Sequence, residues 1–295
     1  MLPVIFRFGP VVLYSFGLML FLGFLSSLFI VWKKTREEYY EEEEVFDVLV
    51  SSGLWALLGA RALYILINFS SFGWDGVAWF NIFGKPGFAL FGAMIAGGLG
   101  IFFQTKKRKW DFFEFTDLLV IGLSLLMTFG WLGAFLNGSG FGLPTESIVG
   151  VRFVGMFDKR HPVQLYSLIL YLLLFLYLLW VEGKYRTFEW YRAGKSGVRS
   201  GFLVFNYMLF SGLIGIVSSV FSPATFHVLD VSLDAWLWLI LVIWGIVGLY
   251  MRSGRNFSKD MESIVGKKSK KKVRLEKREM GRRRERITNI GDDIL

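Results

Sequence analysis

The stretch VVLYSFGLMLFLGFLSSLFIVW, residues 11–32, contains no charged side chain and is followed directly by Lys33, Lys34 and Arg36. It is as long as the ~20 apolar residues that a helix needs to cross a bilayer. Six further apolar blocks follow it along the chain. The sequence therefore predicts an all-α polytopic membrane protein with seven transmembrane helices, at 11–32, 45–69, 86–103, 112–136, 164–181, 202–221 and 235–251.

The composition supports the same class of protein. Hydrophobic residues make up 54% of the 295 residues, aromatic residues 18%, and 31 residues are phenylalanine. A soluble domain of this length could not bury so much apolar surface in one core. A soluble globular protein is therefore excluded.

Basic residues predict the orientation, because cytoplasmic loops carry the excess of Lys and Arg. Of the 33 basic residues, 27 follow the first, third, fifth and seventh spans, whereas 5 lie on the opposite side and Arg61 lies inside a span. The alternation is unbroken. We therefore expect the N-terminus outside and the C-terminus in the cytoplasm.

Several kinds of site are excluded or disfavoured by residue type. The chain has no cysteine, which excludes disulfides, thiolate metal sites and a cysteine nucleophile. The acidic run REEYYEEEE, residues 36–44, suits the N-terminus of the second span and has no metal-ligand spacing. The first span lacks a positive n-region and a small-residue cleavage site, so we expect an anchor and not a removable signal peptide. No metal or cofactor is predicted.

Two regions are predicted along the chain. Residues 1–251 form the membrane domain, with a glycine-rich outer loop at about 137–163 that is long enough to act as a lid or to serve as a plain connector. Residues 252–295 form a basic cytoplasmic tail, either disordered or held to anionic lipid headgroups. Nucleic-acid binding is disfavoured, because no aromatic residues alternate with its charges.

The third span carries small residues at a helical spacing. Gly92, Ala96 and Gly100 stand four apart, so they share one helix face. This pattern lets a neighbouring helix approach closely. We expect it to serve packing.

Two polar residues occur at membrane depth. Arg61 is the basic residue inside a span, and an arginine there usually faces a wet cavity or a partner, or else extends to the interface. Tyr64 lies three residues on and shares its helix face. Asn137 ends the fourth span before Gly138, which suits either a site or a simple helix stop.

The stretch DKRHPVQLYS, residues 158–167, places Arg160, His161 and Gln164 at the outer mouth of the fifth span. The predicted topology puts Arg61 and Asn137 at the same depth. Guanidinium groups bind phosphate bidentately, and histidine can shuttle a proton near neutral pH. The pattern favours a site for an anionic phospholipid; the alternative is a set of ordinary headgroup-facing residues.

At these residues the chain resembles the bacterial prolipoprotein diacylglyceryl transferases. The resemblance is carried by the opening FGPVVLYSFGLM, GARALYIL around Arg61, PGFALFGAMIAGG, GWLGAFLNGSGFG, and most specifically RHPVQLY at 160–166. It covers a little over half of the chain, and more loosely the rest up to the seventh span.

The resemblance implies transfer of a diacylglyceryl group from phosphatidylglycerol to the lipobox cysteine of a preprolipoprotein, in the bacterial plasma membrane. It implies His161 and Arg160 as catalytic residues, with His227 as a candidate helper of the base. It implies lipid or substrate binding by Arg61, Tyr64, Asn137, Gln164 and Tyr166. The partners would be phosphatidylglycerol and the signal peptide of the acceptor.

The chain departs from the family pattern at several signature positions. Phe91 stands at the family's histidine and Trp131 at its signature arginine; the others are Ala134, Ser139 and Phe16. Loss of a cation that faces a developing phosphate charge typically costs about 10²–10³ in rate. A non-catalytic relative that binds phospholipid or signal peptides is therefore the alternative. A transporter is disfavoured, because the spans show no inverted repeat.

Overall fold

The computed structural model describes residues 2–9, 11–82, 84–185, 200–223, 227–228 and 231–253. Met1–Leu249 form one compact unit and Tyr250–Leu295 a second. Every predicted site residue belongs to the first unit. The predicted basic tail, from residue 254 on, lies outside the described residues.

The described part of the chain is mainly helical. The helices are α1 (Ser15–Glu37), α2 (Glu42–Ile67), α3 (Phe69–Phe72), α4 (Gly76–Phe80), α5 (Leu90–Arg108), α6 (Phe112–Asn137), α7 (Val163–Tyr185), α9 (Phe202–Phe221) and α10 (Leu233–Arg252). The strands form three two-stranded antiparallel pairs, β1 (Val4–Phe8) with β2 (Val11–Tyr14), β3 (Val151–Arg152) with β4 (Lys159–Arg160), and β5 (His227–Val228) with β6 (Val231–Ser232).

Six helices among the described residues are long and apolar enough to cross a membrane, namely α1, α2, α6, α7, α9 and α10. The fold is therefore an all-α polytopic membrane fold. The third predicted span forms the helix α5, but it is not one of the six, because its glycines and its polar last turn with Lys106 and Lys107 lower its apolar content. The number of seven spans stays a prediction.

The first helix begins later than the apolar pattern predicted. Residues 11–14 form β2, and α1 begins at Ser15. β1 folds back along β2 with Phe8 opposite Val11, and Gly9 between them adopts a left-handed conformation with φ +57°. Backbone pairing with β1 therefore replaces the first helical turn, a contact that hydropathy alone cannot reveal.

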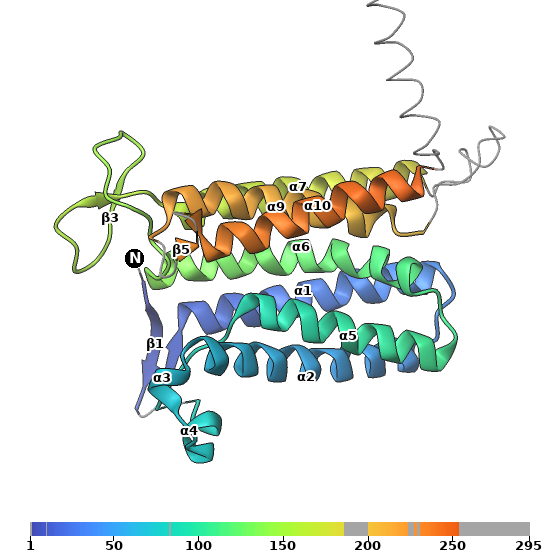
Figure 1. Cartoon of the computed structure of the whole chain (residues 1–295), viewed down its shortest axis with the longest axis horizontal. Coiled ribbons are helices and arrows are strands. Elements are labelled where there is room, and N and C mark those ends of the chain that lie inside the picture. The colour runs from blue at the N-terminus through green and yellow to red at the C-terminus, as the bar shows by residue number, and fades with distance from the viewer. Residues whose placement is uncertain are drawn as a thin grey trace, which may run out of the picture. The chain divides into compact units, whose positions relative to one another are not determined.

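The long helix α6 lies at the centre of the unit. It packs against α1, α5, α7 and α9 (Figure 1). Asp111 caps its first turn by accepting hydrogen bonds from the backbone N–H groups of Phe113 and Glu114 at 2.8 and 3.2 Å. The buried Asp117 carboxylate accepts hydrogen bonds from the N–H groups of Gly201 and Val204 at 2.7 and 2.8 Å, so α6 also holds the start of α9.

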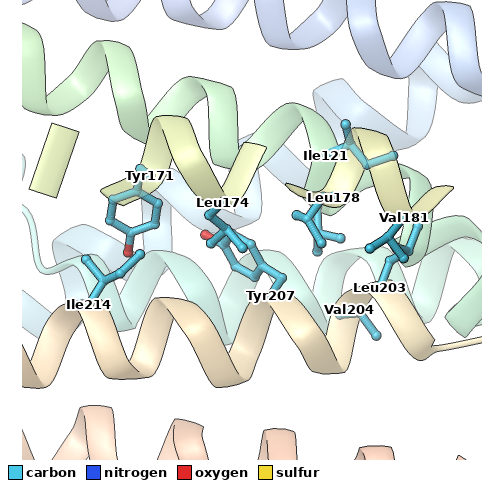
Figure 2. Packing of buried hydrophobic residues seen from close by; sticks show 10 residues of the cluster. Ile121, Tyr171, Leu174, Leu178, Val181, Leu203, Val204, Tyr207 and Ile214 are labelled. Atoms are coloured by element: carbon cyan, nitrogen blue, oxygen red, sulfur yellow. The ribbon is translucent and has the colours of Figure 1, made fainter. Parts of the chain in front are cut away.

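The main apolar core lies between α6, α7 and α9. Tyr171 and Leu178 of α7 face Tyr207 of α9 and Ile121 of α6 (Figure 2). The buried α7 side chains of this core run from Tyr171 to Val181, in the middle of that helix. The cluster comprises Val120, Ile121, Tyr171, Leu174, Leu178, Val181, Leu203, Val204, Tyr207 and Ile214.

Small residues bring α2 and α5 together. A Cβ at Gly92 would collide with the backbone oxygen of Gly59, and a Cβ at Gly59 would collide with Ala96. A Cβ at Gly100 would lie 3.1 Å from the Cα of Ser52. The prediction that Gly92, Ala96 and Gly100 serve close packing is confirmed.

The strand pairs and the short helices α3 and α4 lie at one end of the long helices, which we call the hairpin end. It carries β1–β2, α3, α4 and β3–β4 (Figure 1). Helices α2 and α6 end there, and α7 begins there. The opposite end carries the turns from α1 to α2 and from α5 to α6.

Candidate functional site

The loop between α6 and α7 is a backbone ladder that fixes Arg160 and His161. β4 pairs with β3, the Gly142 N–H donates to the His161 carbonyl at 2.9 Å, and the His161 N–H donates to the Leu143 carbonyl at 3.0 Å. The Leu143 N–H in turn donates to the Phe221 carbonyl at the end of α9, at 2.7 Å. Hydrogen bonds therefore fix the backbone of Arg160 and His161, the two predicted catalytic residues. The role of the loop as a lid stays a prediction.

Gly142 is required by the closeness of its neighbours. A Cβ at this position would lie 2.6 Å from the carbonyl oxygen of Phe221 and 2.9 Å from the Cβ of His161. Both distances are shorter than a van der Waals contact, so a side chain at this position would force the backbone to move. Glycine at position 142 therefore allows the backbone to pass close to both His161 and the end of α9.

His161 contacts the first turns of α7 and the last residue of α9. Its Nδ1 atom lies 3.2 Å from the hydroxyl oxygen of Tyr166, within hydrogen-bonding distance. Its ring centroid lies 4.8 Å from that of Phe221. The hydroxyl orients the imidazole, and the phenyl ring covers one side of it, so the imidazole is held in one direction.

Gln164 is a fully buried polar side chain in the first turn of α7. Its Nε2 atom donates a hydrogen bond to the Ser139 carbonyl at 2.8 Å, which fixes the amide orientation. Its Oε1 atom is buried and has no hydrogen-bonding partner among the described residues. Buried acceptors without a partner are uncommon and call for a ligand or an ordered water.

Arg160 retains hydrogen-bonding capacity. Its Nη1 atom makes one long contact with the Gly142 carbonyl, at 3.4 Å, and its Nε atom is buried without a partner in the part of the chain that the structure describes. The guanidinium carbon lies 5.0 Å from the centroid of the Phe141 ring. A guanidinium with spare donors beside an aromatic face suits a phosphate oxygen.

Arg61 lies in a different cluster. Its guanidinium donates five hydrogen bonds to backbone carbonyls, at 2.8–3.5 Å, and the residue is only 8% exposed. An arginine side chain has five N–H donors, so this one is saturated. The acceptors are the carbonyls of Ala78, Trp79, Asn81, Lys85 and Gly87.

Tyr64 belongs to the Arg61 cluster. Its ring packs edge-on against Phe72, with centroids 6.1 Å apart, and against the backbone of Gly87. The α3 and α4 segments lie on the α2 side of the bundle, whereas β3–β4 lies on the side of α7 (Figure 1). Of the predicted site residues, the structure therefore brings together Arg160, His161, Gln164 and Tyr166, and it places Arg61 and Tyr64 apart from them.

Asn137 is the last residue of α6. Gly138 follows it in a left-handed conformation with φ +75°, and its N–H caps the helix. This geometry fits the interpretation of Asn137 as a helix stop, two residues before the Ser139 carbonyl that binds Gln164. The side chain of His227, the second predicted base, lies outside the described residues.

Aromatic residues occupy two positions where the resemblance implied polar groups. The Phe91 ring lies 4.8 Å from the Trp238 ring of α10, centroid to centroid. Trp131 packs against the core cluster of α7 and α9. Sequence reasoning missed the two rings that border the site, Phe141 and Phe221, because aromatic residues are too frequent in this chain for either to stand out.

The arrangement defines the class of protein and of site. It is a multi-pass α-helical membrane protein with an imidazole, a phenol, a guanidinium and a buried amide gathered at the hairpin end. Within the described ranges, no three His, Asp or Glu side chains stand close enough to share a metal ion. The groups present can bind an anion and move a proton.

Comparison with known proteins identifies the family. The family model for prolipoprotein diacylglyceryl transferase matches residues 3–251, so the chain belongs to that family. It is 32% identical over 197 residues to the phosphatidylglycerol–prolipoprotein diacylglyceryl transferase of Clostridium tetani, covering 62% of this chain and 75% of that one. Transferase 2 of Clostridium perfringens is 33% identical over 58% of this chain and 69% of its own length. The Aeromonas salmonicida protein is 28% identical over 82% and 87%.

Proposed function

We propose that this protein transfers a diacylglyceryl group from phosphatidylglycerol to the lipobox cysteine of a preprolipoprotein in the bacterial plasma membrane. The match of the family model to residues 3–251 carries the proposal, and the names of the relatives supply the two substrates. In this proposal seven helices, α5 among them, cross the membrane, and the hairpin end faces outward, as the distribution of basic residues predicts.

The proposed step exchanges one bond for another. The cysteine thiol gives its proton to His161, and the sulfur attacks the diacylglyceryl carbon that carries the phosphate ester. A carbon–sulfur bond forms as the carbon–oxygen bond breaks, and glycerol phosphate leaves with the electron pair. Tyr166, 3.2 Å from Nδ1, orients the imidazole for this transfer.

Arg160 and Gln164 act on the lipid in this proposal. The free Nε donor of Arg160 binds the phosphate and stabilises the charge that develops as it leaves. The free Oε1 of Gln164 is the acceptor for a headgroup hydroxyl. Asn137 is kept as a lipid-contacting residue, because it adjoins the Ser139 segment that holds Gln164.

In this proposal Arg61 and Tyr64 have a supporting role in place of the lipid contact predicted from the sequence. The five carbonyl partners of Arg61 leave its guanidinium no free donor for a phosphate. We infer that the pair maintains the segment between α2 and α5 instead.

The test is a transfer reaction with purified protein in phosphatidylglycerol nanodiscs and a lipobox peptide. We expect a thioether-linked diacylglyceryl peptide, detected by mass spectrometry, and no product from a peptide whose cysteine is serine. His161→Ala should reduce product formation without changing the unfolding temperature. Absence of product from the unaltered protein, with normal lipid binding, would exclude the transferase function.

A non-catalytic lipid-binding relative is the second candidate. It is favoured by the packing of Phe91 on Trp238 and of Trp131 in the core, which puts apolar rings at two signature positions. This candidate predicts phosphatidylglycerol binding that depends on Arg160, with no thioether product. Measuring binding and turnover on the same preparation separates the two functions.

A further inference from the structure

The segment between α2 and α5 exposes a concentrated apolar surface. It reads NFSSFGWDGVAWF from Asn68 to Phe80 and contains α3 and α4. Trp74 is 86% exposed, Val77 80% and Phe80 81%. Val77 and Phe80 stand three apart on one helical turn and share a face. We call these three side chains the α4 face.

Hydrogen bonds fix the orientation of the segment that carries the α4 face. Arg61 binds the carbonyls of Ala78, Trp79 and Asn81, and the Asp75 carboxylate caps α4 by accepting from the N–H groups of Val77 and Ala78 at 3.0 and 3.3 Å. The Trp79 indole N–H donates to the Gly73 carbonyl at 3.1 Å. These backbone groups are therefore hydrogen-bonded within the protein, whereas the side chains of Trp74, Val77 and Phe80 are exposed.

The position of α4 indicates what covers this face. α4 lies beside α2, within the length of the helices, whereas β3–β4 extends beyond the helix ends (Figure 1). α2 itself carries exposed apolar side chains, among them Leu58 and Leu66, as expected for a span that faces lipid. α4 follows the end of this span in the chain, and tryptophan is enriched at that boundary of the hydrocarbon.

We propose that the α4 face inserts into the headgroup–acyl boundary of the bilayer and anchors the hairpin end at a fixed depth. Its partner is the lipid surface. A tryptophan with two further apolar residues on a short segment whose backbone is hydrogen-bonded is suited to that layer. Arg61 acts as the organising residue, because it joins α2 to the carbonyls of α4. The inference does not depend on the transferase reaction.

The absence of cysteine from the sequence permits a direct test, because one introduced cysteine can be labelled alone. The variant Val77→Cys is labelled with an environment-sensitive NBD fluorophore, and the protein is placed in phosphatidylglycerol–phosphatidylcholine vesicles. We expect blue-shifted emission, quenching by lipids with a shallow spin label, and protection from aqueous iodide. The variant Phe80→Cys is the second probe, in case the first does not fold.

The matched control is Phe157→Cys, since Phe157 is apolar and 96% exposed but lies in the loop between β3 and β4. Its label should emit as in water and be quenched by iodide. Water-like emission and iodide quenching of the labels in both Val77→Cys and Phe80→Cys would overturn the proposal. Blue-shifted emission that lipid spin labels do not quench would also overturn it, because it would mean that protein covers the face.

Discussion

Two arginines at the hairpin end, Arg61 and Arg160, differ in their hydrogen bonding. Arg61 is almost fully buried and gives all five N–H donors to carbonyls of its own chain. Arg160 makes one long contact and keeps a buried Nε without a partner among the described residues. A saturated guanidinium stabilises the fold, whereas one with spare donors can bind an incoming anion. From the sequence both arginines are expected to contact the lipid phosphate, and only the structure shows that Arg61 has no donor left for it.

The largest expected effect is on turnover, in the group formed by Arg160, His161, Gln164 and Tyr166. His161→Ala removes the proposed base, and loss of general-base catalysis typically costs about 10²–10⁴ in rate. Transfer to the lipobox peptide should fall by that factor while the unfolding temperature stays unchanged. A variant that keeps normal turnover would remove His161 from the chemistry.

The next effect is on stability, at the Arg61 cluster. Arg61→Ala removes the donor of five hydrogen bonds to backbone carbonyls, one of them buried and four part-buried, and a hydrogen bond to a charged group contributes about 1.5–3 kcal/mol. We expect the free energy of unfolding in detergent to fall by about 3 kcal/mol or more. Arg160→Ala is the matched control and should change it by only about 1 kcal/mol, because it loses one long hydrogen bond and the contact with the Phe141 ring. An equal loss of unfolding free energy in the two variants would contradict the assignment of a structural role to Arg61 and a binding role to Arg160.

A related effect is expected where α5 supports α2, the helix that carries Arg61. Gly92→Leu forces a side chain against the Gly59 backbone, and overpacking typically costs about 1–3 kcal/mol. Thermal unfolding should detect the loss. Gly98→Ala is the control on the same helix, since no heavy atom of the described residues lies within 4 Å of a Cβ there. A destabilised Gly98→Ala would point to a general effect of glycine replacement.

The smallest effect is expected at Tyr166. Tyr166→Phe keeps the ring and removes the hydroxyl near His161 Nδ1, a net loss of about 0.5–1.5 kcal/mol. Turnover should fall by about 2–10-fold, with the acceptor peptide bound as before. A loss as large as that of His161→Ala would instead give the phenol a direct part in the proton transfer.

Much of the fold could be predicted from the sequence, because bilayer crossing depends on length and apolar composition. The span predicted at 112–136 agrees with α6, Phe112–Asn137. Hydropathy failed where backbone pairing competed with helix formation, at residues 11–14. It also could not reveal that the buried Asp117 holds the start of α9, since the two segments lie 84 residues apart.

The site was predictable only in part, for a physical reason. Residues 160–166 are close in sequence, so the pattern alone placed Arg160, His161, Gln164 and Tyr166 together. Arg61 reaches the same end of the bundle on another helix, and sequence could predict its depth but not its direction. Whether a guanidinium meets carbonyls or open space depends on the tertiary arrangement of the segment between α2 and α5.

The most direct test of the account compares phosphatidylglycerol affinity in Arg160→Gln and Arg61→Lys, both checked for folding by their thermal transition. Affinity is measured by native mass spectrometry, with phosphatidylcholine, a zwitterionic lipid without net charge, as the reference. Loss of a charge-assisted hydrogen bond, about 1.5–3 kcal/mol, predicts roughly 10–150-fold weaker binding for Arg160→Gln. Folded Arg61→Lys should bind as the unaltered protein does. Unchanged affinity in Arg160→Gln, or a selective loss in folded Arg61→Lys, would contradict the account.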